Sequence, residues 1–155
     1  MLPGKGGQHM GEGKVRVGII GAGSIATAIH IPAYQSDARA EVVAVADVVE
    51  ERAREAAAKF GIPHAFTDFQ ELLTLEEVQV VSVCTPNYLH APVTIAALSA
   101  GKDVLCEKPM AITAAQAQAM VDAAERAGKK LMIGFHNRFK PNAQALKRLV
   151  DGGRL

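Results

Sequence analysis

Short apolar runs alternate with longer amphipathic stretches along most of the chain, and this alternation constrains the fold more than any other feature of the sequence. The apolar runs are rich in valine and isoleucine and show little polar alternation, which is typical of strands covered on both faces. Such runs, separated by helical stretches, predict βαβ units and a parallel sheet. The expected strands are Val15–Ile20, Glu41–Ala46, Val80–Cys84, Asp103–Cys106 and Lys130–Gly134, with a short one near Ala65–Phe66.

Residues with known capping preferences mark the ends of the helices between these strands. The first helix is expected to begin near Ser24, and Pro32 should kink or restart it. The other helices are expected over Glu50–Phe60, from a capping box at Thr67 through Leu73, from a cap at Asn87 to Ala100, from a capping box at Thr113 to Gly128, and from Pro141 to Val150. We therefore expect an α/β fold in three layers, with a doubly wound parallel sheet of the Rossmann type. Ligands of such sheets bind beyond the carboxyl ends of the strands.

Composition excludes several classes of protein. A chain of 155 residues, 49% of them hydrophobic, is long enough to bury one core, so we expect a single main domain over residues 14–140. A formal net charge of +1 argues against a nucleic-acid partner and against an acidic membrane surface. No apolar run approaches the roughly 20 residues that a membrane-spanning helix needs.

Two further features bear on the setting of the protein. Residues 1–13 form a glycine-rich lead without the apolar segment of a signal peptide, and we expect them to be disordered. Cys84 and Cys106 each end an apolar run and lack metal-ligand spacing. We interpret them as reduced, buried thiols of a cytoplasmic protein, and we expect no metal site.

Small residues join the first strand to the first helix, in the order Gly21-Ala22-Gly23-Ser24-Ile25-Ala26. This order fits the dinucleotide fingerprint, with alanine in its last position. Small residues allow a pyrophosphate to approach the backbone, where the amides near Ser24 and Ile25 at the helix start would bind it. The alternative is a tight turn that serves only close packing of helix and strand. Because the strand and the helix flank it in the required order, we interpret it as a nucleotide-binding turn.

A carboxylate, Asp47, follows the second expected strand, close to the offset of about 20 residues at which such folds bind the ribose. It would accept hydrogen bonds from both ribose hydroxyls and would repel a 2′-phosphate. No arginine follows it immediately, so the sequence favours NAD. NADP stays open because Arg52 is near, and a carboxylate that merely caps the next helix is the alternative role.

The loop after the third long strand reads Thr85-Pro86-Asn87, with His90 just inside the next helix. Pro86 stops the strand, so this loop should lie at the same edge of the sheet as the glycine turn. A single histidine is as readily structural as functional, and both roles stay open for His90.

Glu107 and Lys108 follow the next strand directly, and Pro109 is expected to hold Lys108 extended. A lysine held by a neighbouring glutamate can polarise a substrate oxygen or share its proton. The alternative is an ordinary surface ion pair.

The last strand leads into His136, Asn137 and Arg138, which should face the same cleft. Arg138 would suit a carboxylate or sugar hydroxyls, and Asn137 would suit the nicotinamide or ribose. A polar connection before the final helix explains these residues equally well.

These motifs together resemble those of the Gfo/Idh/MocA family, which includes glucose-fructose oxidoreductase and inositol dehydrogenase. They fall in order from about Val15 to the end of the chain. Glu107-Lys108-Pro109, with the preceding Thr85-Pro86-Asn87 loop, is far more specific than the glycine fingerprint. The matching stretches are GIIGAGSIA, HIPAY, VVAVAD, CTPNYLHAPV, AGKDVLCEKPM and GFHNRF.

The resemblance implies an NAD(P)-dependent oxidoreductase that acts on a sugar, a polyol or a similar hydroxylated substrate. Hydride passes between a carbinol carbon and nicotinamide C4. The family lysine that matches Lys108 lies beside the nicotinamide and assists proton transfer, while the glutamate that matches Glu107 positions it and the cofactor. The positions expected on the cofactor side are Gly21, Gly23, Ser24, Ile25, Asp47, Thr85, Pro86, Asn87, His90, Glu107 and Lys108; Asn137 and Arg138 are expected on the substrate side.

The chain departs from the family pattern at its far end. Such enzymes carry a second α/β domain that supplies substrate contacts, an aspartate and a histidine for acid/base chemistry, and commonly the oligomer interface. Residues 141–155 look like a helix and a hinge toward that domain. We therefore expect the cofactor domain of a longer oxidoreductase, largely inactive alone, and leave a homo-oligomer open.

Two other function classes stay open. A dinucleotide-binding module without catalysis, such as a sensor or an accessory subunit, would need neither Glu107 nor Lys108. A methyltransferase also combines a glycine turn with a strand-end carboxylate, but the order of the remaining loops speaks against it.

Overall fold

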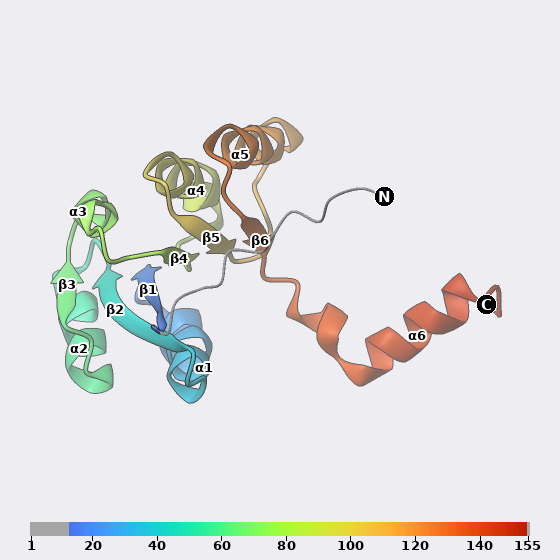
Figure 1. Ribbon diagram of the computed structural model, residues 1–155, viewed down its shortest axis with the longest axis horizontal. Coiled ribbons are helices and arrows are strands. Elements are labelled where there is room, and N and C mark those ends of the chain that lie inside the picture. The colour runs from blue at the N-terminus through green and yellow to red at the C-terminus, as the bar shows by residue number, and fades with distance from the viewer. Residues whose placement is uncertain (1–12, 155) are drawn as a thin grey trace, which may run out of the picture.

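The computed structural model describes residues 13–154, and they form a single six-stranded parallel sheet (Figure 1). The strand order is β3-β2-β1-β4-β5-β6, so the chain winds in both directions from β1, as predicted. The strands are β1 (Val15–Ile20), β2 (Ala40–Ala46), β3 (His64–Phe66), β4 (Val80–Val83), β5 (Asp103–Cys106) and β6 (Leu131–Ile133). Each lies within two residues of its predicted bounds. The predicted disorder of the lead falls almost wholly outside the described residues.

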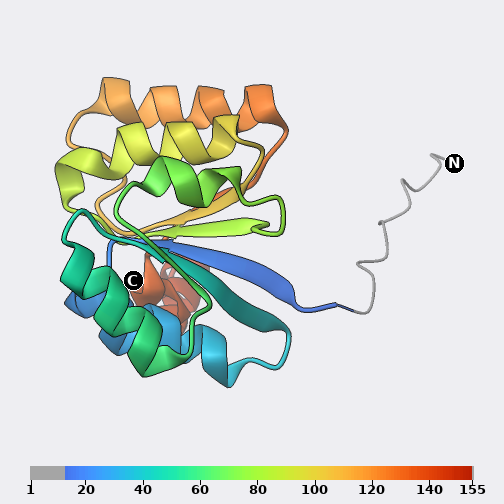
Figure 2. The same ribbon diagram turned by 90° about the vertical axis from the view of Figure 1, so that its left-hand side faces the viewer.

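Helices cover the sheet in two layers, as Figure 2 shows. On one face lie α1 (Ile31–Ser36) and α2 (Glu50–Phe60), where Ile31 and Ala56 pack against Val17, Ile19 and Val45. On the other face lie α3 (Phe69–Thr74), α4 (His90–Ser99) and α5 (Ala114–Ala127). The α/β class and the three layers are therefore confirmed.

The helix starts follow the predicted capping signal at α5 and depart from it at α3 and α4. Thr113 accepts a hydrogen bond from the Gln116 amide at the start of α5, as predicted. Asp68, and not Thr67, caps α3 by accepting from the Gln70 amide. Asn87 does not cap a helix; it begins the short 3₁₀ segment η2 (Asn87–Leu89), which leads into α4.

The first helical segment, residues 24–36, contains a π-helical stretch, η1 (Ala26–His30), immediately before α1. Pro32 has no amide hydrogen, so the regular ladder is interrupted there. The predicted kink or restart takes the form of this wider turn. It leaves the imidazole of His30 in the interior, only 7% exposed.

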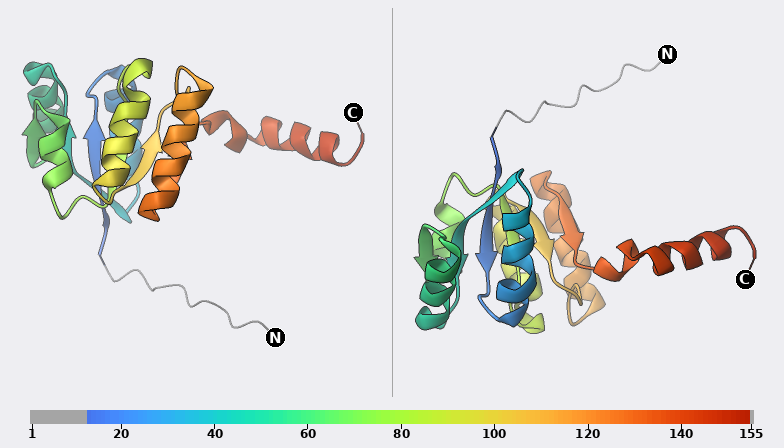
Figure 3. Two further views of the ribbon diagram at one scale, coloured as in Figure 1. Left: turned by 90° about the horizontal axis from the view of Figure 1, so that it is seen from above. Right: turned by 90° about the horizontal axis from the view of Figure 1, so that it is seen from below.

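The C-terminal helix α6 (Pro141–Asp151) extends away from the body of the molecule, as Figures 1 and 3 show. It follows β6 through the 3₁₀ turn η3 (His136–Phe139). Leu146 and Val150 are 55% and 53% exposed, and Met132 on β6 is 50% exposed. The side of β6 that α5 does not cover therefore presents apolar surface. Among residues 13–154, no helix is long and apolar enough to cross a membrane.

Candidate functional site

The residues predicted on the cofactor side lie at or just beyond the carboxyl ends of β1, β2, β4 and β5. The sheet reverses its winding between β1 and β4, and this is where open α/β sheets bind ligands. The Gly21 amide donates to the Ala46 carbonyl and the Cys84 amide to the Ile20 carbonyl, both at 2.8 Å. The three strand ends are thus held together at backbone level.

Two glycines of the turn have different structural roles. Gly21 has a φ of 95°, and a Cβ built on it would lie 2.7 Å from the carbonyl of Cys84, so no larger residue fits. A Cβ on Gly23 would meet nothing within 4 Å. Gly23 therefore faces open space, which a group close to the backbone could occupy.

Asp47 joins the end of β2 to the glycine turn. Its Oδ2 accepts from the Ala22 amide at 2.8 Å, and its Oδ1 accepts from the Val49 amide at 2.9 Å. The carboxylate thus fixes the backbone on both sides of the site. Each oxygen keeps a lone pair for a further donor, so the predicted ribose contact stays compatible with this geometry.

A hollow of about 590 Å³ lies between the turn and α2. Gly23, Ser24 and Thr27 line one side of it, and Arg52 and Lys59 line the other. The first amides of a helix lack partners inside the helix, and they attract anions. Together with the open space at Gly23, these features fit a dinucleotide. Because Arg52 lines this hollow, NADP with its 2′-phosphate stays open as the cofactor.

The loop after β4 places Thr85 beside this region with its hydroxyl oxygen buried and without a hydrogen-bond partner among the described residues. A bound ligand or an ordered water would satisfy a buried polar atom of this kind. Pro86 and Asn87 are exposed on the same loop. Their contacts with a cofactor stay predictions.

His90 is buried, with 1% of its surface exposed, and it joins two loops of the site. Its Nδ1 lies 2.7 Å from the Pro109 carbonyl oxygen, and its Nε2 lies 3.0 Å from the Thr85 carbonyl oxygen. Since carbonyl oxygens only accept, a protonated ring nitrogen of His90 donates in any such hydrogen bond. In this geometry His90 holds the loops together, and any effect on a cofactor would pass through them.

Glu107 is buried while Lys108 is exposed. The sequence left an ion pair between the Glu107 carboxylate and the Lys108 ammonium open as an alternative. In the structure these two groups do not meet. Glu107 Oε2 accepts from the Lys108 backbone amide at 3.1 Å, and Glu107 Oε1 lies 2.9 Å from Nε2 of His30. The Lys108–Pro109 peptide bond is cis. The interpretation as a surface ion pair is therefore wrong.

Burial alone would raise the pKa of Glu107. The hydrogen bonds from His30 and from the Lys108 amide, with the nearby charges of both residues, outweigh burial and lower this pKa overall. A Cβ on Gly134 would lie 3.2 Å from Glu107 Oε1, so the glycine at the end of β6 leaves room for the carboxylate. Glu107 is thus an ionised group held inside the protein beneath an exposed lysine.

The two thiols do not supply a nucleophile. Burial raises the pKa of Cys84 to about 12 and that of Cys106 to about 11, so both stay protonated at neutral pH. Both are free and buried, as predicted.

Asn137 and Arg138 lie on η3, beyond the end of β6, and are exposed. The Arg138 guanidinium lies 5.5 Å from the centroid of the Phe135 ring and lines a hollow with Gln144 and Lys147 of α6. The structure therefore groups Arg138 with α6. The substrate contacts of Asn137 and Arg138 stay predictions.

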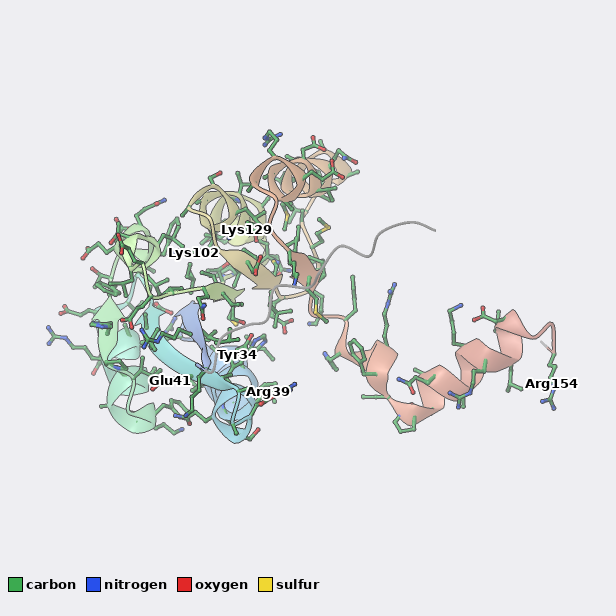
Figure 4. The ribbon with its side chains drawn as sticks, in the orientation of Figure 1. Tyr34, Arg39, Glu41, Lys102, Lys129 and Arg154 are labelled. Carbon is green, nitrogen blue, oxygen red and sulfur yellow. The ribbon has the colours of Figure 1, made fainter. Side chains whose placement is uncertain are left out.

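Sequence reasoning did not single out His30 and Ser82. Ser82 Oγ lies 2.8 Å from Nδ1 of His30. Tyr34 of α1, which Figure 4 labels, is a further partner of Ser82. Burial raises the pKa of the Tyr34 hydroxyl, and its hydrogen bond with Ser82 opposes this rise. One signal was present: Ser82 is the only polar residue of β4, whose sequence is VVSV.

The fold and this site define a class: a dinucleotide-binding Rossmann domain with a buried carboxylate and an exposed lysine at the carboxyl edge of its sheet. Residues 15–135 match the oxidoreductase family with an NAD-binding Rossmann fold, known as GFO_IDH_MocA. The chain belongs to this family, which confirms the resemblance seen in the sequence.

Named relatives agree with this assignment. The chain is 41% identical over 144 residues to D-glucoside 3-dehydrogenase of Escherichia coli K12, covering 93% of this chain and 41% of that protein. It is 36% identical over 143 residues to inositol 2-dehydrogenase of Salmonella typhimurium LT2, covering 91% and 43%. The chain therefore spans about two-fifths of the length of these relatives.

Solved structures show the same fold. The WlbA dehydrogenase of Bordetella pertussis, in complex with NADH and UDP-GlcNAcA, matches with a TM-score of 0.85 and 32% identity over 91% of this chain and 43% of that one. The 3-ketoreductase KijD10 of Actinomadura kijaniata, in complex with NADP, matches with a TM-score of 0.83 and 33% identity over 90% and 44%. The structures that the chain resembles thus include proteins crystallised with either nicotinamide cofactor.

Proposed function

We propose that this chain is the cofactor domain of an NAD(P)-dependent oxidoreductase that transfers hydride between the nicotinamide and a hydroxylated carbon of a sugar or polyol. The observation that carries the proposal is the buried Glu107 carboxylate, which accepts from the backbone amide of the exposed Lys108 and lies 2.9 Å from His30 of the helical segment that begins at the glycine turn. A domain that only bound a dinucleotide would not need a buried charge at this place. Family membership and the names of the relatives support the same reaction class.

The roles of the residues follow from their positions. Gly21 shapes the turn, and Gly23, Ser24 and Ile25 offer backbone to the pyrophosphate. Asp47 accepts from the ribose hydroxyls while it holds the Ala22 amide. When bound, the nicotinamide supplies the hydride acceptor or donor. Lys108 then exchanges a proton with the substrate hydroxyl, and Glu107 fixes the backbone from which that lysine extends.

The substrate class and setting are part of the proposal. The printed names of relatives point to glucosides and inositol, and Asn137 and Arg138 would contact such hydroxyl groups. Exposed apolar side chains on β6, η3 and α6, among them Met132, Phe139 and Leu146, would suit a homo-oligomer. Buried free thiols fit a cytoplasmic protein.

Titration of the 155-residue chain with NADH, NADPH and S-adenosylmethionine, followed by fluorescence or calorimetry, tests the proposal. Only the reduced nicotinamides should bind, with NADH preferred. Asp47→Ala should weaken NADH binding by about tenfold or more, the loss expected for hydrogen bonds to a charged group. Asp122→Ala, which removes a partly exposed carboxylate from α5, is the matched control. Binding of S-adenosylmethionine alone would contradict the proposal.

A further inference from the structure

His30, Ser82 and Glu107 form a buried chain of polar side chains that neither the family match nor the relatives' names assign. They come from η1, from β4 and from the residue after β5. The exposed fractions are 7% for His30, 0% for Ser82 and 9% for Glu107. Nδ1 of His30 lies 2.8 Å from Ser82 Oγ, and Nε2 lies 2.9 Å from Glu107 Oε1. These contacts join segments that are far apart along the chain.

The hydrogen-bond roles within this chain follow from the chemistry of its groups. An ionised carboxylate only accepts, so Nε2 of His30 carries the proton that faces Glu107. The Ser82 hydroxyl can donate to Nδ1 when the ring is neutral and accept from it when the ring is charged. Ser82 therefore keeps the ring in one orientation in either state, and the donor to Glu107 is always present.

The Glu107 carboxylate connects His30 with Lys108. One carboxylate oxygen is held by His30, and the other accepts from the Lys108 backbone amide at 3.1 Å. Without His30, a buried carboxylate would lose its main side-chain partner and would turn toward water or take up a proton. The hydrogen bond to the Lys108 amide would weaken in either case.

His30 also links the lysine to the cofactor side of the site. Residues 24–36 form one helical segment that starts at the glycine turn and carries His30 in its π-helical part. The segment that would hold the pyrophosphate at its start thus holds the Glu107 carboxylate further along.

We propose that His30, held by Ser82, is a positioning residue that acts through Glu107 to fix Lys108 relative to the bound nicotinamide. The relation to the nicotinamide rests on the function proposed above. We call the hydrogen-bonded series from His30 through Glu107 to the Lys108 amide the clamp. It is a property of the free chain and can be tested without a ligand.

Hydrogen exchange of individual amides in the 155-residue chain tests the clamp. Glu107→Ala removes the acceptor and should speed exchange of the Lys108 amide about tenfold. His30→Leu should reproduce most of this increase. His30→Gln, which can still donate to Glu107, should restore exchange to within about threefold of wild type. The Gln116 amide, bonded to Thr113 on α5, should be unaffected in all variants and reports any global loss of stability.

A ligand experiment tests the link to the nicotinamide. His30→Leu should leave the affinity for ADP-ribose, which lacks the nicotinamide, within about twofold, because a distant substitution barely affects that contact. It should change the nicotinamide fluorescence of bound NADH in the same direction as Lys108→Ala. His64→Leu is the matched control, since His64 lies on β3 and pairs with Glu77.

Each outcome has a defined meaning. Wild-type exchange of the Lys108 amide in His30→Leu would overturn the positioning role. An equal loss of ADP-ribose and NADH affinity in that variant would also overturn it, because His30 would then act through the glycine turn. Failure of the wild-type chain to bind either ligand would instead contradict the proposed function, while the exchange measurement would still decide the clamp.

Discussion

The carboxylate of Glu107 lies 2.9 Å from the imidazole of His30, and this contact connects the helix that begins at the glycine turn with the loop that carries Lys108. Both side chains are buried. The glycine turn and the loop of Lys108 are therefore parts of one packed unit, and we expect a substitution in one to affect the other. Four measurements on residues in and around this unit follow from the structure.

The two glycines of the turn should respond differently to substitution by alanine. Gly21→Ala should destabilise the protein by about 2–4 kcal/mol, because its Cβ would strike the Cys84 carbonyl and its φ of 95° is strained for alanine. Gly23→Ala should change the unfolding free energy by less than about 1 kcal/mol, since its Cβ meets nothing. NADH affinity should nevertheless fall in Gly23→Ala, because the methyl group would occupy the space proposed for the pyrophosphate.

Urea unfolding gives the stability of each variant, and fluorescence titration with NADH gives its affinity. Wild-type NADH affinity in Gly23→Ala would contradict the placement of the pyrophosphate. Wild-type stability in Gly21→Ala would contradict the close contact with Cys84.

Glu107 should make stability depend on pH in a definite direction. Its pKa is lowered in the folded protein relative to the usual 4.5, so folding favours the ionised form. This stabilisation is fully present above the unfolded pKa and is lost as the pH falls through the folded pKa. The unfolding free energy of wild type should therefore decrease between about pH 5 and pH 3 more steeply than that of Glu107→Gln.

Urea unfolding at a series of pH values measures this difference. Subtracting the two curves removes the contributions of other carboxylates, such as Asp37, whose pKa is lowered by the hydrogen bonds from Arg39. Glu125→Gln on α5 controls for the loss of one negative charge. Parallel curves for wild type and Glu107→Gln would show that Glu107 is not held ionised in the folded state.

Strands β1, β2 and β4 were readily predicted because they are valine- and isoleucine-rich runs separated by helical stretches. The glycine turn, Asp47 and Glu107-Lys108 could also be located, since the carboxyl ends of parallel strands meet at one edge. The partners of these residues could not be predicted. Nothing in the local sequence shows that His30 reaches Glu107, because that contact depends on the π-helical turn and on the packing of three strands.

The caps illustrate the same limit on a smaller scale. Thr67 and Asp68 are both good capping residues, and only the backbone geometry decides in favour of Asp68. Glu107 and Lys108 are adjacent in sequence, so a surface ion pair stayed open as an alternative. The carboxylate instead points into the protein, where His30 satisfies it.

Replacement of His90 should loosen the two loops that it joins. His90→Leu keeps similar bulk but removes both contacts to the Thr85 and Pro109 carbonyls, so we expect a loss of about 2–4 kcal/mol of stability. Amides of the two loops should exchange faster than those of α5. His136→Leu, on the exposed turn η3, should change stability by less than about 0.5 kcal/mol and serves as the control. Equal stability of the two variants would show that the contacts of His90 contribute little.

The thiols should be unreactive in the folded protein. Their pKa values, raised by burial to about 12 for Cys84 and about 11 for Cys106, favour the neutral thiol at pH 8, and neither sulfur is exposed. An aromatic disulfide reagent should therefore label almost no thiol in minutes under native conditions. In denaturant it should label both cysteines of the chain at once. Rapid native labelling of one thiol would mean that its strand end opens to solvent, and comparing Cys84→Ser with Cys106→Ser would identify which. Since both thiols lie beneath the site, slower labelling in the presence of NADH would further show that ligand binding suppresses this opening.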